Sequence, residues 1–471
     1  CGTVPDLIGK RYGENFARFC VVVVLTLTSF NYVTAQINAT GTMASRALSI
    51  PFELGVWVGL VSIVLCSMLG GMRGVTWTQV AQYIVLIIAY LLPVFWISNK
   101  MGAGFFPHFM LADEVARIAD LEAQFGLGTV TNSAADLATV PKGLAGITKA
   151  HSAVNATPWA FISLALAMMM GTASLPHVMM RYFTTPSVKA ARKSVGWSLF
   201  FIFLLYSSAP MLATLSKLSL IDPNLATGII GKSISEVQAI DWYQNWNQAN
   251  LMFVSDFNGN GTLELNEFFM GGKAVVLATP EIAGLPYVIS GLVAAGGMAA
   301  AMSTADGLIL AIANALSHDL YYKIIDPKAE TAKRLVVARV LLVVIGFAGA
   351  TIAAMEIQGI LGSVIWAFDF AMSGLFFPLV LGVWWKRANR EGAIAGMALG
   401  LASGMGYLIW VRNGGSGFLG ITQLTFGIFG SAVSLVSMVV VSLITSEPDA
   451  ATQKMVDEVR VPAGKSILGK H

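Results

Sequence analysis

The oxygen atoms best spaced to bind a small cation lie in residues 291–319, GLVAAGGMAAAMSTADGLILAIANALSHD. This stretch is rich in alanine and glycine and is long enough to cross a membrane as one helix. Helical spacing places the carbonyl of Ala300 and the hydroxyls of Ser303 and Thr304 on one face. Hard oxygen atoms in a dry site suit an alkali cation that has lost its water. The alternative is that both hydroxyls bond to preceding carbonyls of their own helix.

A second oxygen-rich pattern occurs in a more polar stretch. Residues 256–267, DFNGNGTLELNE, match the twelve-residue EF-hand calcium loop, with Gly261 at its sharp turn. The predicted Ca²⁺ ligands are Asp256, Asn258, Asn260, Thr262, Glu264 and Glu267. A single loop of moderate charge indicates a structural site with a Kd of roughly 10⁻⁴–10⁻³ M. The alternative is an Asn/Gly-rich turn that binds nothing.

Residues 168–181, MMMGTASLPHVMMR, have the features of a helix that is interrupted within the membrane. Gly171 and Pro176 bracket a short polar stretch that contains Thr172 and Ser174. Glycine loosens a helix and proline removes a backbone donor. Unwound backbone is tolerated at membrane depth where it lines a cavity, and its freed N–H groups favour an anionic ligand. We therefore expect these residues to line a binding site, unless the helix is merely kinked and His177 is an ordinary core residue.

Two acidic residues, Asp306 and Asp369, fall inside long apolar runs. A charge at the centre of a bilayer costs about 2.5–3.5 kcal/mol on insertion scales, so each acid needs a partner or a path to water. A role in ion coupling is one interpretation. A structural hydrogen bond, or a protonated carboxyl group, is the other.

The composition is that of a polytopic, all-α membrane protein. Hydrophobic residues make up 56% of the 471 residues and charged residues only 12%, about half the charged fraction of a soluble protein. A β-barrel would show short alternating segments in place of long apolar runs. We expect ten transmembrane helices, at roughly 15–40, 52–70, 75–97, 157–181, 194–217, 283–317, 333–356, 359–384, 391–411 and 419–445.

Lys and Arg are concentrated in the short loops on one side of these spans, which predicts that the N-terminal segment and the C-terminal tail are cytoplasmic. The long loops 98–156 and 218–282, the second with the EF-hand-like motif, then face outside. The net charge of +3 gives no indication of a nucleic-acid partner. The sequence contains no nucleophile–base pairing, phosphate-binding loop or His/Cys cluster, so we expect no enzyme.

Three motifs resemble the sodium:solute symporter family. The first is Ala300-x-x-Ser303-Thr304 with Ser317-His318-Asp319-Leu320-Tyr321 at the end of the same helix. The second is GVWWKRANREGAIAGMALG at residues 382–400, and the third is SMLGGM at residues 67–72. The resemblance covers essentially the whole chain.

The resemblance implies sodium-coupled solute uptake by a single transmembrane symporter domain spanning residues 1–471, in a bacterial inner membrane. The implied fold has two inverted five-helix repeats, of the leucine-transporter type. Compared with the core helices of that fold, the chain is expected to start just before the third, and the first two would lie upstream of Cys1. Ala300, Ser303 and Thr304 would bind Na⁺.

The run GTASLPHVMMRYFTTPSVKAARKS resembles the acetate and short-chain monocarboxylate branch of the family in particular. That resemblance implies a substrate site formed by Gly171, Thr172, Ser174, Pro176, His177 and Gln36. Gln79 stands where several members have an Asp that is tied to a second cation site, which favours one coupled cation. A symporter-like solute sensor and a proton-coupled carrier that uses Asp306 or Asp369 are the alternatives. The sequence leaves open whether a small membrane subunit is needed.

Overall fold

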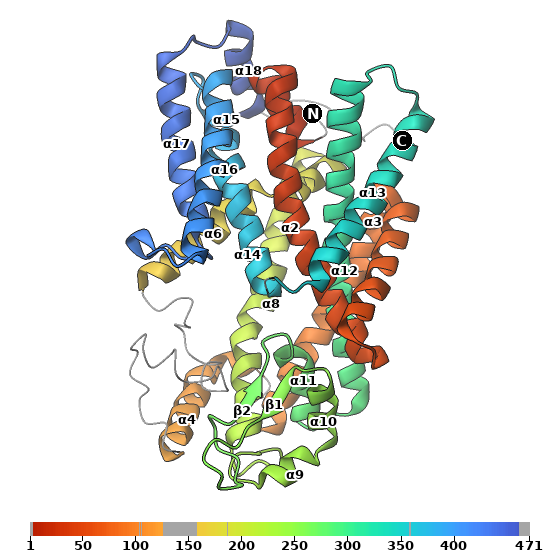
Figure 1. The fold of residues 1–471 in the computed structure, drawn as a ribbon, viewed down its shortest axis with the longest axis vertical. Helices are drawn as coiled ribbons and strands as arrows, with labels where there is room; N and C mark the ends of the chain where they lie inside the picture. The colour runs from red at the N-terminus through yellow and green to blue at the C-terminus, as the bar shows by residue number, and fades with distance from the viewer. Residues whose placement is uncertain are drawn as a thin grey trace.

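The computed structural model describes residues 3–102, 104, 106–125, 158–185, 187–357 and 359–460. Its long helices run side by side in an elongated bundle, and a small module lies at one end of that bundle (Figure 1). The helix α18, the last described element, lies at the opposite end (Figure 1). The elements are α1 (Val4–Tyr12), α2 (Glu14–Leu48), α3 (Phe52–Lys100), η1 (Pro107–Phe109), α4 (Leu111–Gln124), α6 (Pro158–Ser174), α7 (Pro176–Met179), η3 (Met180–Thr184), α8 (Val188–Ile221), α9 (Ile234–Gln238), α10 (Asp241–Gln248), β1 (Met252–Val254), β2 (Phe268–Met270), α11 (Val275–Ile282), α12 (Tyr287–Asn314), η4 (Ala315–Ile325), α13 (Thr331–Ala354), α14 (Ile360–Ala371), η5 (Met372–Phe376), α15 (Phe377–Trp384), α16 (Arg390–Arg412), η6 (Phe418–Gly420), α17 (Phe426–Ile444) and α18 (Ala450–Arg460).

Each of the ten expected spans falls on a helix. Within the described part of the chain, eight helices are long and apolar enough to cross a membrane. A ninth span is the bent pair Trp159–Ser174 and Pro176–Tyr182, and the shorter apolar helix Phe52–Met68 accounts for the tenth. The prediction of a polytopic helical membrane protein is therefore confirmed. The expected external loop 98–156 lies largely outside the described residues.

Several of these helices depart from regular geometry within the bundle. Gly71 has φ +52° and ψ −168°, which separates α3 into two helical halves. Such a φ favours glycine because other L-residues are strained there. A bend of 49° separates α6 from α7. The segments η4 and η5 are π-helical, a geometry that is frequent at functional sites.

The helix α12 forms the central contact of the bundle, because it packs against both α2 and α3. The apolar core between them contains Leu25, Ile37, Ile63, Leu308 and Ile312, all at most 1% exposed. The helix α14 packs against α2 and α6, and the pair α16 and α17 packs on η5. The broken helix and the predicted sodium face are therefore both connected to α2.

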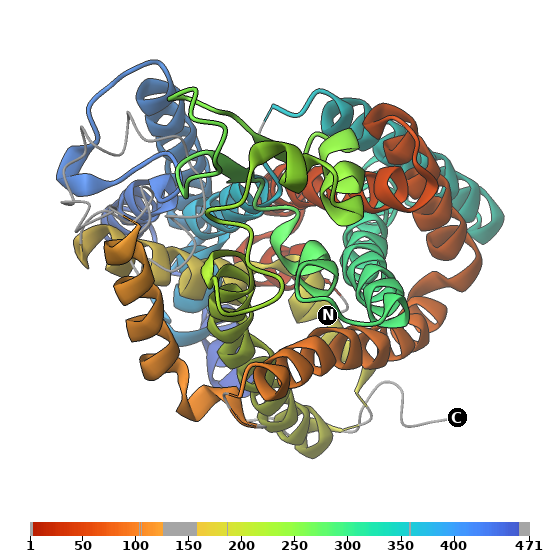
Figure 2. The same ribbon diagram turned by 90° about the horizontal axis from the view of Figure 1, so that it is seen from below.

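The small module is built on the end of α8 and contains α9, α10, α11 and a two-stranded sheet (Figures 1 and 2). The strands β1 and β2 are antiparallel, with Phe253 opposite Phe269. Its apolar core includes Trp246, Leu263 and Phe268. Arg46 of α2 lies over the Trp246 ring at 4.9 Å, and Trp246 Nε1 donates to Glu281 Oε2 over 3.0 Å. Arg46 also pairs with Glu281 over 3.3 Å, so its contacts with Trp246 and Glu281 fasten the module to α2.

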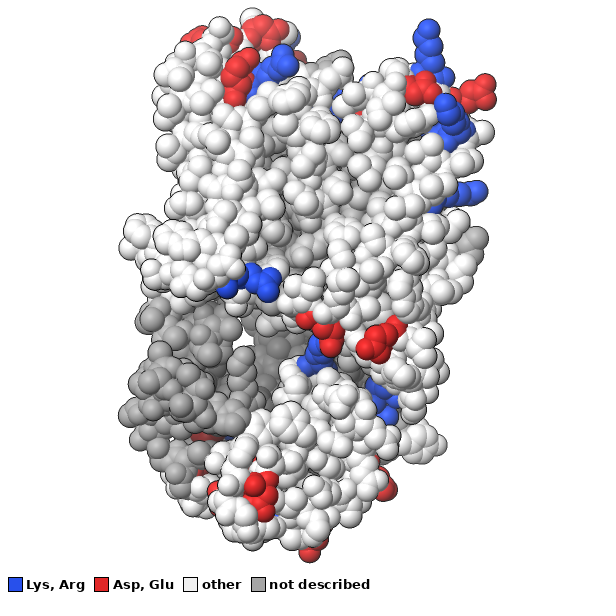
Figure 3. Space-filling model, viewed as in Figure 1, with Lys and Arg blue, Asp and Glu red and all other residues white. Residues whose placement is uncertain are grey.

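Charged side chains avoid the middle of the bundle on the face shown in Figure 3. They gather at the end with α17 and α18 and around the module (Figure 3). A wide uncharged band between two charged ends is what a bilayer requires of a spanning protein.

Candidate functional site

The predicted sodium face lies on α12, where α12 packs against α3. Ser303 Oγ donates to the Ala300 carbonyl over 2.9 Å, and Thr304 Oγ1 donates to the same carbonyl over 3.4 Å. The three oxygen atoms therefore converge as the spacing predicts. They are also in the arrangement of the alternative interpretation, with both hydroxyls bonded back to their own helix.

Gln79 lies directly against this face. Its side-chain Nε2 donates a hydrogen bond to the Ser303 carbonyl. An added Cβ at Gly307 would lie 3.3 Å from that nitrogen and 2.9 Å from Nη2 of Arg181. Arg181 in turn donates to Thr76 Oγ1 over 3.2 Å. Both side chains therefore lie against α12 one turn beyond Ser303, and Gly307 leaves the space for them.

Asp306 is fully buried two residues after Thr304. Its Oδ1 accepts a hydrogen bond from Ser67 Oγ over 3.0 Å, and its Oδ2 has no hydrogen-bond partner within the described ranges. Ser67 lies four residues before the break at Gly71. Asp306 and Ser67 therefore connect the predicted sodium face to the break in α3.

Asp369 lies apart from that cluster, on α14. It is also fully buried, and both of its carboxylate oxygens lack a hydrogen-bond partner among the residues that the structure describes. Its closest neighbour on α17 is Gly427, where an added Cβ would lie 2.6 Å from Oδ1. Gly427 is in the first turn of α17, so the positive end of that helix faces the carboxyl group. This placement favours the structural interpretation of Asp369.

The predicted substrate segment is a broken helix. Leu175 is the extended residue at the break, with φ −70° and ψ 117°. Gly171 lies so close to α14 that an added Cβ would be 2.5 Å from Phe368 Cβ. Thr172 Oγ1 and Ser174 Oγ donate to the carbonyls of Met168 and Met170, over 2.6 and 2.7 Å. Their hydroxyl protons are therefore used within α6.

His177 lies just after the break, beside an aromatic residue of α2. Its ring centroid is 5.7 Å from that of Tyr32, in an edge-to-face arrangement. The buried Nδ1 of His177 has no hydrogen-bond partner in the described part of the chain. Tyr32 also contacts Phe368, with centroids 5.8 Å apart. Gln36 is one helical turn beyond Tyr32 on α2, so both residues belong to the same helix face.

The predicted calcium loop closes on itself through its own side chains. The Asp256 carboxylate accepts hydrogen bonds from the backbone N–H groups of Gly259 and Gly261, over 2.7 and 3.0 Å. Glu267 is fully buried and accepts from the N–H groups of Phe257 and Glu264, over 3.0 and 2.9 Å.

The two amide side chains of the loop bond in the same way. Asn258 Oδ1 and Asn260 Oδ1 accept from the N–H groups of Asn260 and Thr262, over 2.9 and 2.7 Å. Both amide nitrogens donate to Glu264 Oε1. The carboxylates are not gathered around one point, since no group of three or more His, Cys, Asp or Glu side chains in the described ranges is placed to hold a metal.

Two contacts in this region could not be found from the residue pattern. Ser67 pairs with Asp306 although 239 positions separate them, and no local spacing links the two residues. The second is the contact of Gly171 with Phe368. Phe368 is an aromatic residue in an apolar helix, which is the usual pattern of a lipid-facing or core residue. In the sequence, Tyr32 and Gln36 are polar groups inside an apolar span. Their polarity is the one local feature that indicates which face of α2 points toward the broken helix.

Known proteins similar to this chain are transporters. An uncharacterized symporter of Cupriavidus necator is 33% identical, over 97% of this chain and 80% of the relative. A monocarboxylic acid transporter of Corynebacterium glutamicum is 26% identical, over 86% of this chain and 65% of the relative. The fold is similar to that of a Na⁺-coupled sialic acid symporter in its substrate-bound outward-open state, with a TM-score of 0.61, 17% identity and coverage of 95% of this chain and 78% of that one. The expected symporter fold is thereby confirmed.

The sequence profile of the sodium:solute symporter family matches residues 2–231 and 273–400. The match includes the predicted sodium face, the broken helix and both buried acids, and it omits residues 232–272 with the calcium-loop motif. Family and fold are those of integral membrane transporters that couple sodium to a small solute. The chain therefore belongs to the sodium:solute symporter family.

Proposed function

We propose that this protein takes up a short-chain monocarboxylate, such as acetate, together with Na⁺ by alternating access. The observation that carries the sodium part is the convergence of the Ala300, Ser303 and Thr304 oxygens on α12, at its contact with α3. The monocarboxylate part draws support from the relative named as a monocarboxylic acid transporter.

We assign Na⁺ binding to Ala300, Ser303 and Thr304. Each hydroxyl oxygen keeps lone pairs while its proton bonds to the Ala300 carbonyl. Rotation of the two hydroxyl protons away from that carbonyl would leave oxygen atoms of all three residues available for one cation. Of the two buried acids we favour Asp306 for ion coupling, because it lies two residues beyond Thr304, whereas Asp369 lies on α14, apart from the proposed cation ligands.

We place the substrate at the break between α6 and α7, lined by Gly171, Thr172, Ser174, Pro176, His177 and Gln36. A monocarboxylate needs hydrogen-bond donors for its charged end and an apolar wall for its alkyl end. The Nδ1 of His177, which has no partner in the described chain, supplies a donor in the tautomer that carries the proton on this nitrogen. The neighbouring Tyr32 and Phe368 rings supply apolar surface.

We infer a bacterial inner-membrane location in which the C-terminal tail is cytoplasmic and the module on the end of α8 is external. The basic short loops support this orientation through the positive-inside rule. Since α18, which precedes the C-terminal tail, and the module lie at opposite ends of the bundle (Figure 1), the two assignments are consistent with each other.

We further propose that residues 256–267 bind one Ca²⁺ through Asp256, Asn258, Asn260, Thr262, Glu264 and Glu267. The support is the match of residue types at the coordinating positions, together with the closed loop in which Gly259 and Gly261 adopt φ of +72° and +69°. Glu267 has the chemistry of the bidentate closing ligand, and its carboxylate is buried with only backbone donors around it in the described chain.

The test of the transport function is uptake of radiolabelled acetate by the full-length protein in proteoliposomes, with Na⁺ or choline outside. We expect Na⁺-dependent uptake that falls about tenfold in Ser303→Ala and in Thr304→Ala, because each substitution removes one cation ligand. Ser437→Ala and Thr351→Ala remove hydroxyls with the same intrahelical bonds elsewhere in the bundle, and we expect both to transport normally.

Three outcomes would change the assignment. Na⁺ protection against heat without acetate uptake would retain the symporter and discard the monocarboxylate. Uptake that is indifferent to Na⁺ but stimulated by acid would support the proton-coupled alternative. Substrate binding without uptake in any condition would support the sensor alternative.

A further inference from the structure

We propose that Tyr32 and Phe368 form the wall that limits the carbon-chain length of the transported acid. The inference rests on the proposed function, since it concerns the same site at the break between α6 and α7. It adds two residues to the site, neither of which was predicted to bind substrate.

Aromatic rings from two scaffold helices meet the broken helix at one place. Tyr32 of α2 lies between the His177 ring, at 5.7 Å, and the Phe368 ring of α14, at 5.8 Å. Phe368 and Leu175, the residue at the break, belong to one apolar cluster, with exposures of 7% and 2%. The wall therefore stands directly beside the break and beside the unpaired Nδ1 of His177.

The position of Phe368 is fixed by its backbone, because Gly171 packs against it. An added Cβ at Gly171 would lie 2.5 Å from Phe368 Cβ, 2.8 Å from its carbonyl oxygen and 2.9 Å from its Cα. The Phe368 atoms that Gly171 meets are therefore backbone atoms and Cβ, and not the ring. The ring lies in the apolar cluster with Leu175 and contacts Tyr32, so its replacement by leucine keeps the close approach at Gly171.

This arrangement gives the two ends of a short acid different surroundings. The carboxylate finds a donor at His177 Nδ1 in the tautomer that carries its proton there, and the alkyl end meets two flat rings that have few rotamers. One methylene group in an apolar pocket changes discrimination by roughly 10–200-fold. A rigid wall therefore excludes longer acids, and a smaller side chain in either position of the wall should admit them.

The experiment measures how well unlabelled acetate, butyrate and hexanoate inhibit Na⁺-dependent uptake of radiolabelled acetate in proteoliposomes. The variants are Tyr32→Leu and Phe368→Leu, which shorten the wall, and Tyr32→Phe, which keeps the ring. Phe370→Leu is the matched control, because Phe370 is on the same helix but packs on Phe426 at 5.0 Å, away from the break.

We expect wild type, Tyr32→Phe and Phe370→Leu to prefer acetate over butyrate by tenfold or more. In Tyr32→Leu and Phe368→Leu the preference for acetate should shrink by about tenfold, which is the smallest discrimination that one methylene group usually provides. Either of the two variants suffices if the other does not fold.

An unchanged preference in a folded Tyr32→Leu or Phe368→Leu protein would overturn the wall while leaving the transport function intact. So would a wild type that takes acetate and hexanoate equally well. A wild type that no carboxylate inhibits would instead overturn the proposed substrate class, and the wall with it. The same shift in Phe370→Leu would show that loss of packing, and not the wall, alters the profile.

Discussion

Ser67 Oγ donates a hydrogen bond to Asp306 Oδ1 over 3.0 Å and thereby joins the first half of α3 to the middle of α12. The two residues are 2% and 0% exposed. In the described chain, this is the one hydrogen bond that reaches the Asp306 carboxylate, since Oδ2 has none. This buried hydrogen bond thus links the part of α3 just before the break at Gly71 to the helix that carries the predicted sodium face.

Removal of the Ser67 hydroxyl should destabilise the protein, because it leaves a buried carboxylate oxygen without its donor. A buried acceptor that loses its only donor costs about 1–3 kcal/mol. We therefore expect Ser67→Ala to lower the apparent melting temperature in detergent, and Asp306→Ala, which removes the acceptor, to lower it as well. The double variant should lose clearly less stability than the two single variants together, because both substitutions remove the same contact.

The control for this cycle is Ser437→Ala paired with Asp306→Ala. Ser437 donates only to carbonyls of its own helix, so this pair should be additive within about 0.5 kcal/mol. Equal additivity for the Ser67 pair would mean that the hydrogen bond contributes nothing measurable. Na⁺ titration should show weakened protection by Na⁺ in Asp306→Asn, which keeps the acceptor for Ser67 and removes the charge, if Asp306 takes part in ion coupling.

Gly171→Ala should reduce transport sharply. The added methyl group would overlap the backbone of Phe368, which has no flexible end to move aside. Such overpacking costs about 1–3 kcal/mol and would separate α6 from α14 at the break. We expect uptake to fall about tenfold, which uptake assays in proteoliposomes would measure. Gly196→Ala on α8 meets nothing within 4 Å and should behave as wild type; equal activity of both variants would contradict the close contact.

The sequence predicted the spans well because a bilayer imposes long apolar helices, whose ends are marked by charge. It also predicted a break before Pro176, since proline acts locally on the backbone, but the break is confined to Leu175 and the helix continues through Gly171 and Ser174. The convergence of the Ala300, Ser303 and Thr304 oxygens follows from helical spacing, and their binding of Na⁺ stays a prediction. All three features depend on residues that are close together in the chain.

Contacts between distant segments could not be predicted in the same way. Nothing in the pattern around Ser67 indicates that its hydroxyl meets Asp306, and nothing around Phe368 indicates that Gly171 lies against its backbone. The same limit applies to the two buried acids, which looked equivalent in the sequence. The structure separates them, since Asp306 lies beside the sodium face and Asp369 at the first turn of α17.

Calcium should stabilise the protein if residues 256–267 bind it. At 1 mM Ca²⁺, a site with a Kd of 10⁻⁴ M would add about 1.4 kcal/mol of stability. We expect a higher apparent melting temperature with Ca²⁺ than with EGTA, and no such increase in Glu267→Gln, which lacks the charged closing ligand. Glu236→Gln changes an exposed acid of the same module and should keep the Ca²⁺ effect. An equal increase in Glu267→Gln would place the bound Ca²⁺ elsewhere.

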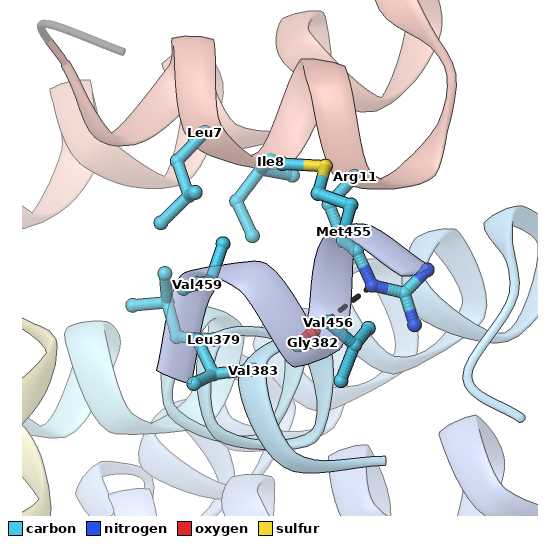
Figure 4. A pocket seen from close by; sticks show the side chains of 9 residues that line it. All are labelled: Leu7, Ile8, Arg11, Leu379, Gly382, Val383, Met455, Val456 and Val459. Carbon is cyan, nitrogen blue, oxygen red and sulfur yellow. Dashed lines mark hydrogen bonds between the residues drawn. The ribbon is translucent and has the colours of Figure 1, made fainter. Parts of the chain in front are cut away.

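Arg11 holds the end of α15 to α1 with hydrogen bonds to three carbonyls. Its Nε donates to Gly382 O over 2.9 Å, and its Nη2 donates to Trp385 O and Ala388 O over 3.1 and 2.8 Å. Burial lowers the pKa of this guanidinium, although the adjacent Tyr12 acts in the opposite direction. The α18 helix covers the same place, where its apolar side chains line a small pocket with Arg11 and residues of α1 and α15 (Figure 4).

We therefore expect Arg11→Lys to destabilise the protein although the charge is kept. An ammonium group cannot reproduce the planar fork that reaches carbonyls in different directions, and hydrogen bonds to charged groups contribute about 1.5–3 kcal/mol. The apparent melting temperature should fall in Arg11→Lys and remain unchanged in Arg192→Lys, because Arg192 is exposed near the start of α8. A normal melting temperature for Arg11→Lys would mean that its charge, and not its geometry, fastens α15 to α1.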